Sequence, residues 1–299
     1  MNIVKKRILG ILVGCLFIAA YYPVFDILVK KWSESEDYTH AFFTVPIILY
    51  MGWSRRQSFI DGRGWPITGL IVLTLATVFY ILSLQLQIPS FIALSMGLTV
   101  FGAILYMSGA RVVIEMVIPL LLLILLIPIP EQLLSMLTGS LQLRVSEASE
   151  LILRLIGVPL YREGNVLHIP GKTFQVVDVC SGLRSLISLV TLSLILGYFS
   201  LKRNWAMGSL VVLSIPVAIL INIMRVVALV LAYHFYRLDL SSGTAHTVLG
   251  LLLFVIALVV VLALQRVLER WETPKVVLNN GATSKNDAML SGTGNGTGM

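Results

Sequence analysis

The chain has 299 residues, of which 57% are hydrophobic and only 12% charged, and its mean hydropathy is +0.91. A soluble domain of this length carries about twice that fraction of charged residues, so the composition excludes an ordinary soluble globular protein. The formal net charge is +7, but the basic residues gather in short loops between apolar runs, which is typical of a membrane protein and argues against nucleic-acid binding.

Apolar runs long enough to cross about 30 Å of hydrocarbon recur along most of the sequence and predict an all-α integral membrane protein. We expect about eight transmembrane helices with both termini in the cytoplasm, because loops rich in Lys and Arg stay on that side. The first run has no small-residue cleavage site, so we expect a retained helix. The predicted spans cover residues 8–27, 41–53, 65–84, 89–107, 112–127, 182–199, 205–233 and 247–264.

Residues 131–179, between the fifth and sixth spans, have a different pattern. Apolar residues recur mostly at three- and four-residue steps over 131–156 and predict an amphipathic helix on or beside the membrane. Short extended runs at 158–161, 166–169 and 174–179, the first two separated by the turn-like 163–165, predict a small β ribbon over the outer face. We take 1–272 as one polytopic domain and expect a disordered cytoplasmic tail over 273–299, which is rich in Gly, Ser, Thr and Asn.

The loop charges predict that Cys180, Arg225 and His246 lie toward one outer face. Cys180 precedes the sixth span and His246 the eighth, while Arg225 lies in the outer half of the seventh, about 12 Å from its end. These residue types can supply a thiol nucleophile, a donor that stabilises an oxyanion, and a general base.

Each of these residues also has a structural interpretation. A cysteine beside a membrane helix is often a small buried hydrophobe, as we expect for Cys15. Cys180 differs because Arg184 lies one turn further on, and a cation and a helix N-terminus both favour the thiolate over the reference pKa of about 8.5. Arg225 either makes a structural ion pair or faces a polar site, with Asn222 on the same helix face.

The choice of the histidine stays open on topology alone, since His40 is expected at the same outer face as His246. The two cysteines make neither a disulfide framework nor a zinc site. The sequence also contains no phosphate-binding loop, no HExxH and no metal-ligand cluster, so we expect neither a cofactor nor a metal.

Several ordered motifs resemble the exosortase/archaeosortase family, over about residues 30–265. The most specific is the segment 179–186, VCSGLRSL, which resembles the signature around the cysteine of that family. Thr39 and Ala41 depart from the family's DYSHG element. The other matching pieces are DYTHA at 37–41, PIP at 128–130, EGN at 163–165, the P-A pair at Pro216 and Ala218, NIMRV at 222–226, and His246 followed by Gly250.

The resemblance implies a bacterial exosortase, a membrane-embedded cysteine protease and transpeptidase. Such enzymes cleave secreted proteins that end in a short motif such as Pro-Glu-Pro, a membrane helix and a basic cluster, and pass them to an acceptor such as a lipid or glycan. On this chain it implies Cys180 as nucleophile, Arg225 as stabiliser of the intermediate and His246 as acid/base, with Arg184, Asn222 and His40 in support. It further implies the bacterial inner membrane, with the site and residues 131–179 facing the periplasm.

Two alternatives remain at this point. The chain could be a non-enzymatic membrane component, such as a transporter subunit or an assembly factor for exopolysaccharide export, in which case Cys180→Ala would be tolerated. It could also be a membrane protease that hydrolyses its substrate without transfer, using the same residues.

Overall fold

The structure is a computed structural model that describes residues 3–35, 38–176, 182–241 and 243–272. Most of these residues are helical, and a small sheet lies between two long helices. The helices of the first half are α1 (Ile3–Ala20), α2 (Tyr22–Glu34), α3 (Ala41–Ser54), α4 (Arg56–Asp61), α5 (Pro66–Leu86), α6 (Pro89–Ser108), α7 (Ala110–Glu115) and α8 (Val117–Leu125). Then follow α9 (Glu131–Leu155), the strands β1 (Tyr161–Glu163), β2 (Val166–Ile169) and β3 (Lys172–Gln175), and the helices α11 (Gly182–Ser200), α12 (Asn204–Tyr236) and α13 (Gly243–Glu272).

The chain is a membrane protein with several apolar helices. Within the described residues, α5, α6, α11, α12 and α13 are the 5 helices long and apolar enough to cross a membrane. The number rises to 6 if α1 and α2, which meet at 60°, form one broken span. We expected about eight spans, but the structure shows shorter helices in two of the predicted places.

The shorter helices are α3, with 14 residues, and the pair α7 and α8, which divide the predicted span 112–127 at Met116. Pro119 accounts for that division, because it has no N–H to donate to the carbonyl of Glu115 one turn earlier.

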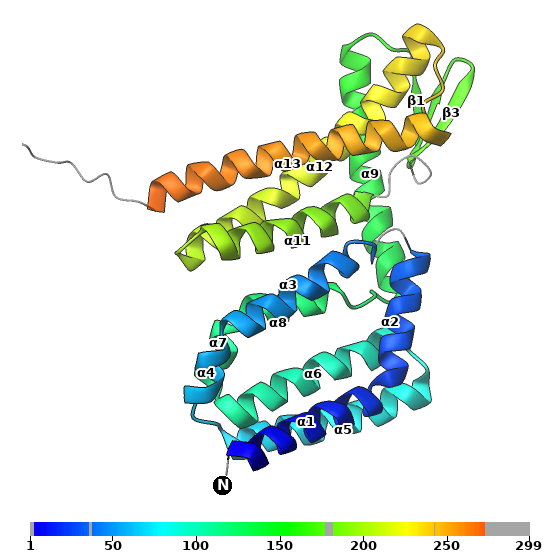
Figure 1. The fold of residues 1–299 in the computed structure, drawn as a ribbon. Helices are drawn as coiled ribbons and strands as arrows, with labels where there is room; N and C mark the ends of the chain where they lie inside the picture. The colour runs from blue at the N-terminus through cyan, green and yellow to red at the C-terminus, as the bar shows by residue number, and fades with distance from the viewer. Residues whose placement is uncertain (1–2, 36–37, 177–181, 242, 273–299) are drawn as a thin grey trace, which may run out of the picture.

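The long helices lie side by side in two groups (Figure 1). One group contains α11, α12 and α13, and the other is built around the α5–α6 hairpin. Between them, Met51 of α3, Leu122 of α8 and Leu194 of α11 are buried in one core cluster. The N-terminal end of α1 and the C-terminal end of α13 lie at the same end of the bundle, whereas α9 and the sheet lie at the opposite end.

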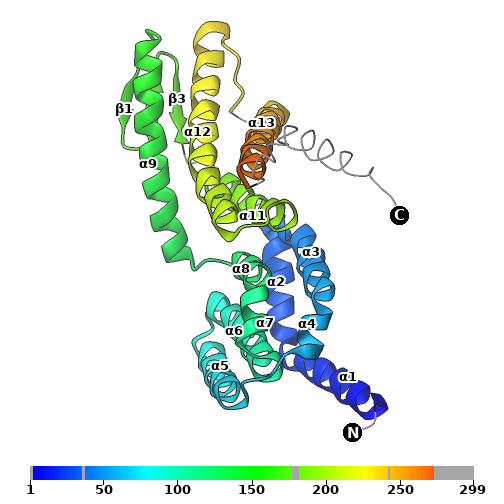
Figure 2. The same ribbon diagram turned by 90° about the vertical axis from the view of Figure 1, so that its left-hand side faces the viewer.

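α9 confirms the helix predicted over 131–156, and it runs across the end of the bundle (Figure 1). In Figure 2, α9, the sheet and α12 lie side by side. Val145 and Leu153 of α9, Phe174 of β3 and Val226 of α12 belong to one buried cluster. Because Val226 adjoins Arg225, this core fixes the part of α12 that carries the arginine.

The sheet is antiparallel in the order β1-β2-β3. Glu163 pairs with Val166, which leaves Gly164 and Asn165 as the turn that the sequence predicted, with Gly164 at φ +61°. The second turn, 170–171, places Pro before a glycine at φ +90°, the arrangement that a type II turn requires. β3 begins directly after this turn, at Lys172, so the prediction that the third extended run begins at residue 174 was wrong. Residues 177–179 of that predicted run lie outside the described residues.

The prediction of a first strand at 158–161 was also wrong, because this segment caps α9. The N–H of Gly157 donates to the carbonyl of Arg154, and the N–H of Val158 donates to that of Leu153, both at 3.0 Å. With Gly157 at φ +90°, these two bonds form a Schellman cap that satisfies the last carbonyls of the helix. The strand therefore begins only at Tyr161.

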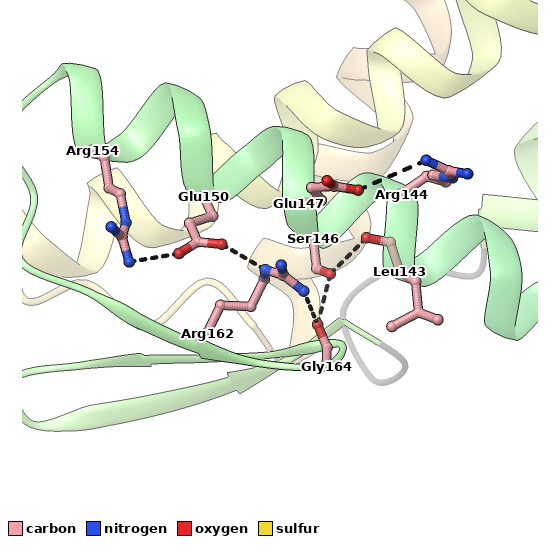
Figure 3. Close-up of polar contacts among 8 residues, drawn as sticks. All are labelled: Leu143, Arg144, Ser146, Glu147, Glu150, Arg154, Arg162 and Gly164. Atoms are coloured by element: carbon pink, nitrogen blue, oxygen red, sulfur yellow. Dashed lines mark hydrogen bonds and ion pairs between the residues drawn. The ribbon is translucent and has the colours of Figure 1, made fainter.

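A polar network joins α9 to this sheet (Figure 3). The Glu150 carboxylate accepts from Arg162 Nε at 2.5 Å and from Arg154 Nη2 at 2.7 Å. Arg162 Nη1 and Ser146 Oγ both donate to the carbonyl of Gly164, each at 2.9 Å. The hydrogen bond from Arg162 and the charge of Arg154 hold the pKa of Glu150 below its usual range.

Candidate active site

Arg225 and His246, which lie on different helices, are in direct contact. Arg225 Nη2 is 2.8 Å from His246 Nε2, and both residues are half-buried. α12 ends at Tyr236 and not at the predicted residue 233, because Arg237 turns into the left-handed region at φ +54°. α13 begins at Gly243 and not at 247, so His246 lies within its first turn. The helices thus bring together two residues that the sequence placed at one face.

The contact determines the state of the imidazole. An arginine side chain is always protonated and can only donate, so His246 Nε2 must be the acceptor. The ring is therefore neutral and carries its proton on Nδ1. The backbone of Leu240, in the loop before α13, lies beside the same ring.

Beside Arg225, the helices α11, α12 and α13 enclose a cavity of about 20 Å³, which is enough for one water molecule. Ser185, Asn222, Arg225 and Gly250 contribute polar groups or backbone to its lining. The Nε of Arg225 is buried and has no hydrogen-bond partner among the described residues. A buried donor of this kind is available to a ligand oxygen.

Gly250 leaves room for the guanidinium. It lies one turn after His246 on α13, and a Cβ at this position would stand 2.8 Å from Arg225 Nη2. Any larger residue would push the arginine away from its place beside His246. The motif of histidine and glycine four residues apart thus has a steric reason, which a single helix does not reveal.

Comparison with known proteins gives the family of the chain. The family model of transmembrane exosortases matches residues 32–263, a range that includes Cys180, Arg225 and His246. The chain belongs to the transmembrane exosortase family. Neither the search of curated proteins nor the search of solved structures found a match.

In this exosortase, Cys180 lies outside the described residues. β3 ends at Gln175, and α11 begins at Gly182. Arg184, in the first turn of α11, is half-buried, and its charge acts on the His246 ring. Asn222 is buried at 3% exposure, one turn before Arg225. Asn222 lines the same cavity as Arg225, and Arg184 is near enough to His246 for its charge to act on the ring.

His40 lies at the start of α3, half-buried, and the histidine that contacts Arg225 is His246. The motif around His40 meets the proline pair instead. Tyr38, 2% exposed, accepts a hydrogen bond from the N–H of Ile129 at 2.9 Å. Two motifs that are about ninety residues apart in the sequence thus join the α2–α3 connection to the α8–α9 connection.

The sequence did not indicate that the loop before α13 reaches the candidate site. Leu240 carries no recognisable pattern, and only the spatial proximity of its backbone to His246 identifies it. Among the described residues, no group of three or more His, Cys, Asp or Glu could hold a metal ion.

Proposed function

We propose that this exosortase is a cysteine transpeptidase that cleaves C-terminal sorting signals of secreted proteins and passes the processed protein to a lipid or glycan acceptor. The observation that supports it most is the hydrogen bond between Arg225 and His246, inside the family match. It joins a cation, which can stabilise an oxyanion, to a neutral imidazole, which can act as the base for a thiol nucleophile.

In this proposal, Cys180 Sγ attacks the carbonyl carbon of the scissile peptide bond, and His246 takes the thiol proton. Arg225 stabilises the oxyanion of the tetrahedral intermediate. His246 then gives its proton to the leaving amine, and the carbonyl remains bound to Cys180 as a thioester. The acceptor's nucleophile attacks the thioester, and its proton passes through His246 to restore the Cys180 thiol.

Proton transfer and oxyanion binding are coupled through one nitrogen. His246 Nε2 accepts from Arg225 in the resting state, so a proton that arrives there ends the hydrogen bond. The Nη2 donor of Arg225 then becomes free as negative charge develops on the substrate oxygen. The buried Nε of Arg225 provides a second donor for the same charge.

The substrate tail is itself a membrane helix with a basic cytoplasmic end, so it enters from the lipid. We place the end of the bundle that carries α9 and the sheet at the periplasmic face of the bacterial inner membrane, with both chain termini in the cytoplasm. In this arrangement α3 and the α7–α8 pair complete the eight crossings. The cleavage site of the substrate then stands at the level of His246.

The test is processing of a co-expressed sorting-signal protein in cells that lack their own exosortase. Cys180→Ala is expected to insert normally and to leave the substrate unprocessed, whereas Cys15→Ala, at the other cysteine of the chain, is expected to process it like the wild type. Processing by Cys180→Ala would contradict the proposal. The mass of the mature C-terminus distinguishes transfer, which adds the acceptor, from hydrolysis, which adds water.

A further inference from the structure

The loop between α12 and α13 is held by the sheet through Lys172, the first residue of β3. Lys172 Nζ forms a salt bridge with Asp239 and donates a hydrogen bond to Ser241 Oγ at 2.9 Å. Asp239 Oδ1 in turn accepts from the N–H of Ser241 at 3.0 Å and from its hydroxyl at 2.5 Å. We call these three residues the loop clamp.

The base of the loop clamp is rigid. The Lys172 ammonium lies 5.0 Å from the ring centroid of Phe174 and 5.5 Å from that of Tyr233, so two aromatic faces fix its position. Tyr233 also donates from its hydroxyl to the carbonyl of Gly171 at 3.0 Å, and Arg237 donates to that of Pro170 at 3.2 Å. The turn before β3 is thus bound to the end of α12.

The residue between the two clamped loop residues contacts the candidate site. The side chain of Leu240 packs against the core cluster shared by α9, the sheet and α12. Its backbone lies beside the His246 ring. Because Arg225 occupies Nε2, the proton of the neutral ring is on Nδ1, a buried atom that has no hydrogen-bond partner among the described residues.

We propose that Lys172 is a positioning residue, which holds residues 239–241 and through them the start of α13, so that His246 keeps Nε2 facing Arg225. The inference rests on the proposed function, because it assigns His246 the role of acid/base. The side chain of Lys172 is 19% exposed and that of Asp239 is 51% exposed, so the ion pair lies at the edge of the solvent.

The loop clamp is intact over the physiological pH range. The hydrogen bonds from Lys172 and Ser241 lower the pKa of Asp239 to about 2. Since this pKa is lower in the folded than in the unfolded protein, the contribution of Asp239 is complete above its ordinary pKa of about 3.9 and is lost only as the pH falls toward 2. An assay near pH 7 therefore measures the clamped state.

The experiment compares Lys172→Met with Lys30→Met in the purified full-length protein. Lys30 forms an i,i+4 ion pair with Asp26 on α2, so the control also removes one lysine from one salt bridge. With a sorting-signal peptide as substrate, Lys172→Met is expected to lower kcat at least about tenfold while KM changes less than about twofold. Lys172→Arg is expected to recover most of the loss, and Lys30→Met to keep the wild-type kcat.

Nitrogen NMR of ¹⁵N-histidine-labelled protein provides a readout independent of turnover. The wild type is expected to show His246 as the Nδ1-protonated tautomer, and Lys172→Met a mixture of tautomers. If Lys172→Met does not fold, Asp239→Asn takes its place, because it removes the same charge pair with a side chain of equal size. Asp239→Asn is also expected to show a mixture of His246 tautomers. An unchanged tautomer with wild-type kcat in either folded variant would overturn the inference. If the proposed function itself is wrong, a different result shows it: Cys180→Ala would still process the substrate.

Discussion

The hydrogen bond between Arg225 and His246 determines the protonation state of the imidazole. An imidazolium at His246 would present an N–H to the guanidinium, so the hydrogen bond at 2.8 Å exists only with the neutral ring. In the proposed reaction the neutral ring is the form that can act as a base toward the thiol. Gly250 is part of the same arrangement, because its missing side chain provides the space that Arg225 occupies.

Gly250→Ala tests that arrangement. The added Cβ would lie 2.8 Å from Arg225 Nη2, so the guanidinium has to shift, and the processing rate is expected to fall about tenfold to a hundredfold. Gly208→Ala on α12 is the control, since a Cβ there meets nothing within 4 Å. Quantitative processing assays at equal membrane levels compare the two variants. Equal rates for both would show that Arg225 does not need this space.

The sequence predicted much of this site but not its contacts. Loop charges and span positions placed Arg225 and His246 at one face, and the family resemblance preferred His246 to His40. The hydrogen bond between them depends on how α12 packs against α13, and no periodicity in either helix encodes that. The loop clamp was missed for the same reason, because Lys172 and Asp239 belong to segments that meet only in the folded chain.

Among the secondary-structure elements, α9 holds the β1–β2 hairpin of the sheet through a network of polar contacts. Glu150 binds two arginines, and it is 17% exposed, whereas Glu147 on the same helix is 62% exposed with a single partner, Arg144, at 3.9 Å. Since exposed ion pairs contribute little, the Glu150 network is the one expected to hold the sheet in place. The sheet in turn carries Lys172.

Glu150→Gln is expected to lower the free energy of unfolding by about 1–2 kcal/mol at pH 7, whereas Glu147→Gln changes it little. Because the folded-state pKa of Glu150 lies below its ordinary value, its contribution is complete above about pH 4.3 and is lost as the pH falls through the folded-state value. Thermal unfolding in detergent as a function of pH measures the difference. A difference that persists unchanged into strong acid is incompatible with this account.

Element boundaries followed the sequence where local chemistry decides them. α5 and α6 begin at Pro66 and Pro89, as predicted within a residue, because proline fits the first helical turn and the apolar runs fill each helix. β1 was misplaced because the extended-looking Val158 is used to cap α9. The Pro170–Gly171 dipeptide is a turn signal in the sequence that marks the start of β3 two residues before the predicted residue 174.

In the molecule as a whole, both described ends of the chain lie at one end of the bundle, opposite α9, the sheet and the beginning of α13, which carries His246 (Figure 1). The basic connection between α11 and α12 lies with the chain ends, since Glu272 accepts from the N–H groups of Lys202 and Arg203 at 2.9 and 2.8 Å. This segregation matches the positive-inside pattern of the sequence.

Tag accessibility tests the orientation. Tags fused before residue 1 or after residue 272 are expected to be protected from a membrane-impermeant label added outside the cytoplasm, because both ends lie on the basic side. A tag inserted between Gly164 and Asn165, at the tip of the first hairpin turn, is expected to be labelled. Labelling of the tag after residue 272 would reverse the proposed topology.

A thiol mechanism requires a covalent intermediate on Cys180 during turnover, and this intermediate can be measured. The Cys15→Ala variant retains Cys180 as its one thiol and allows an acid-quenched reaction with a sorting-signal peptide to be analysed by peptide mass. We expect the peptide that contains Cys180 to carry the N-terminal part of the substrate as a thioester, and we expect no such adduct in Cys180→Ala. Cleavage of the substrate at the wild-type rate without Cys180 would contradict the account.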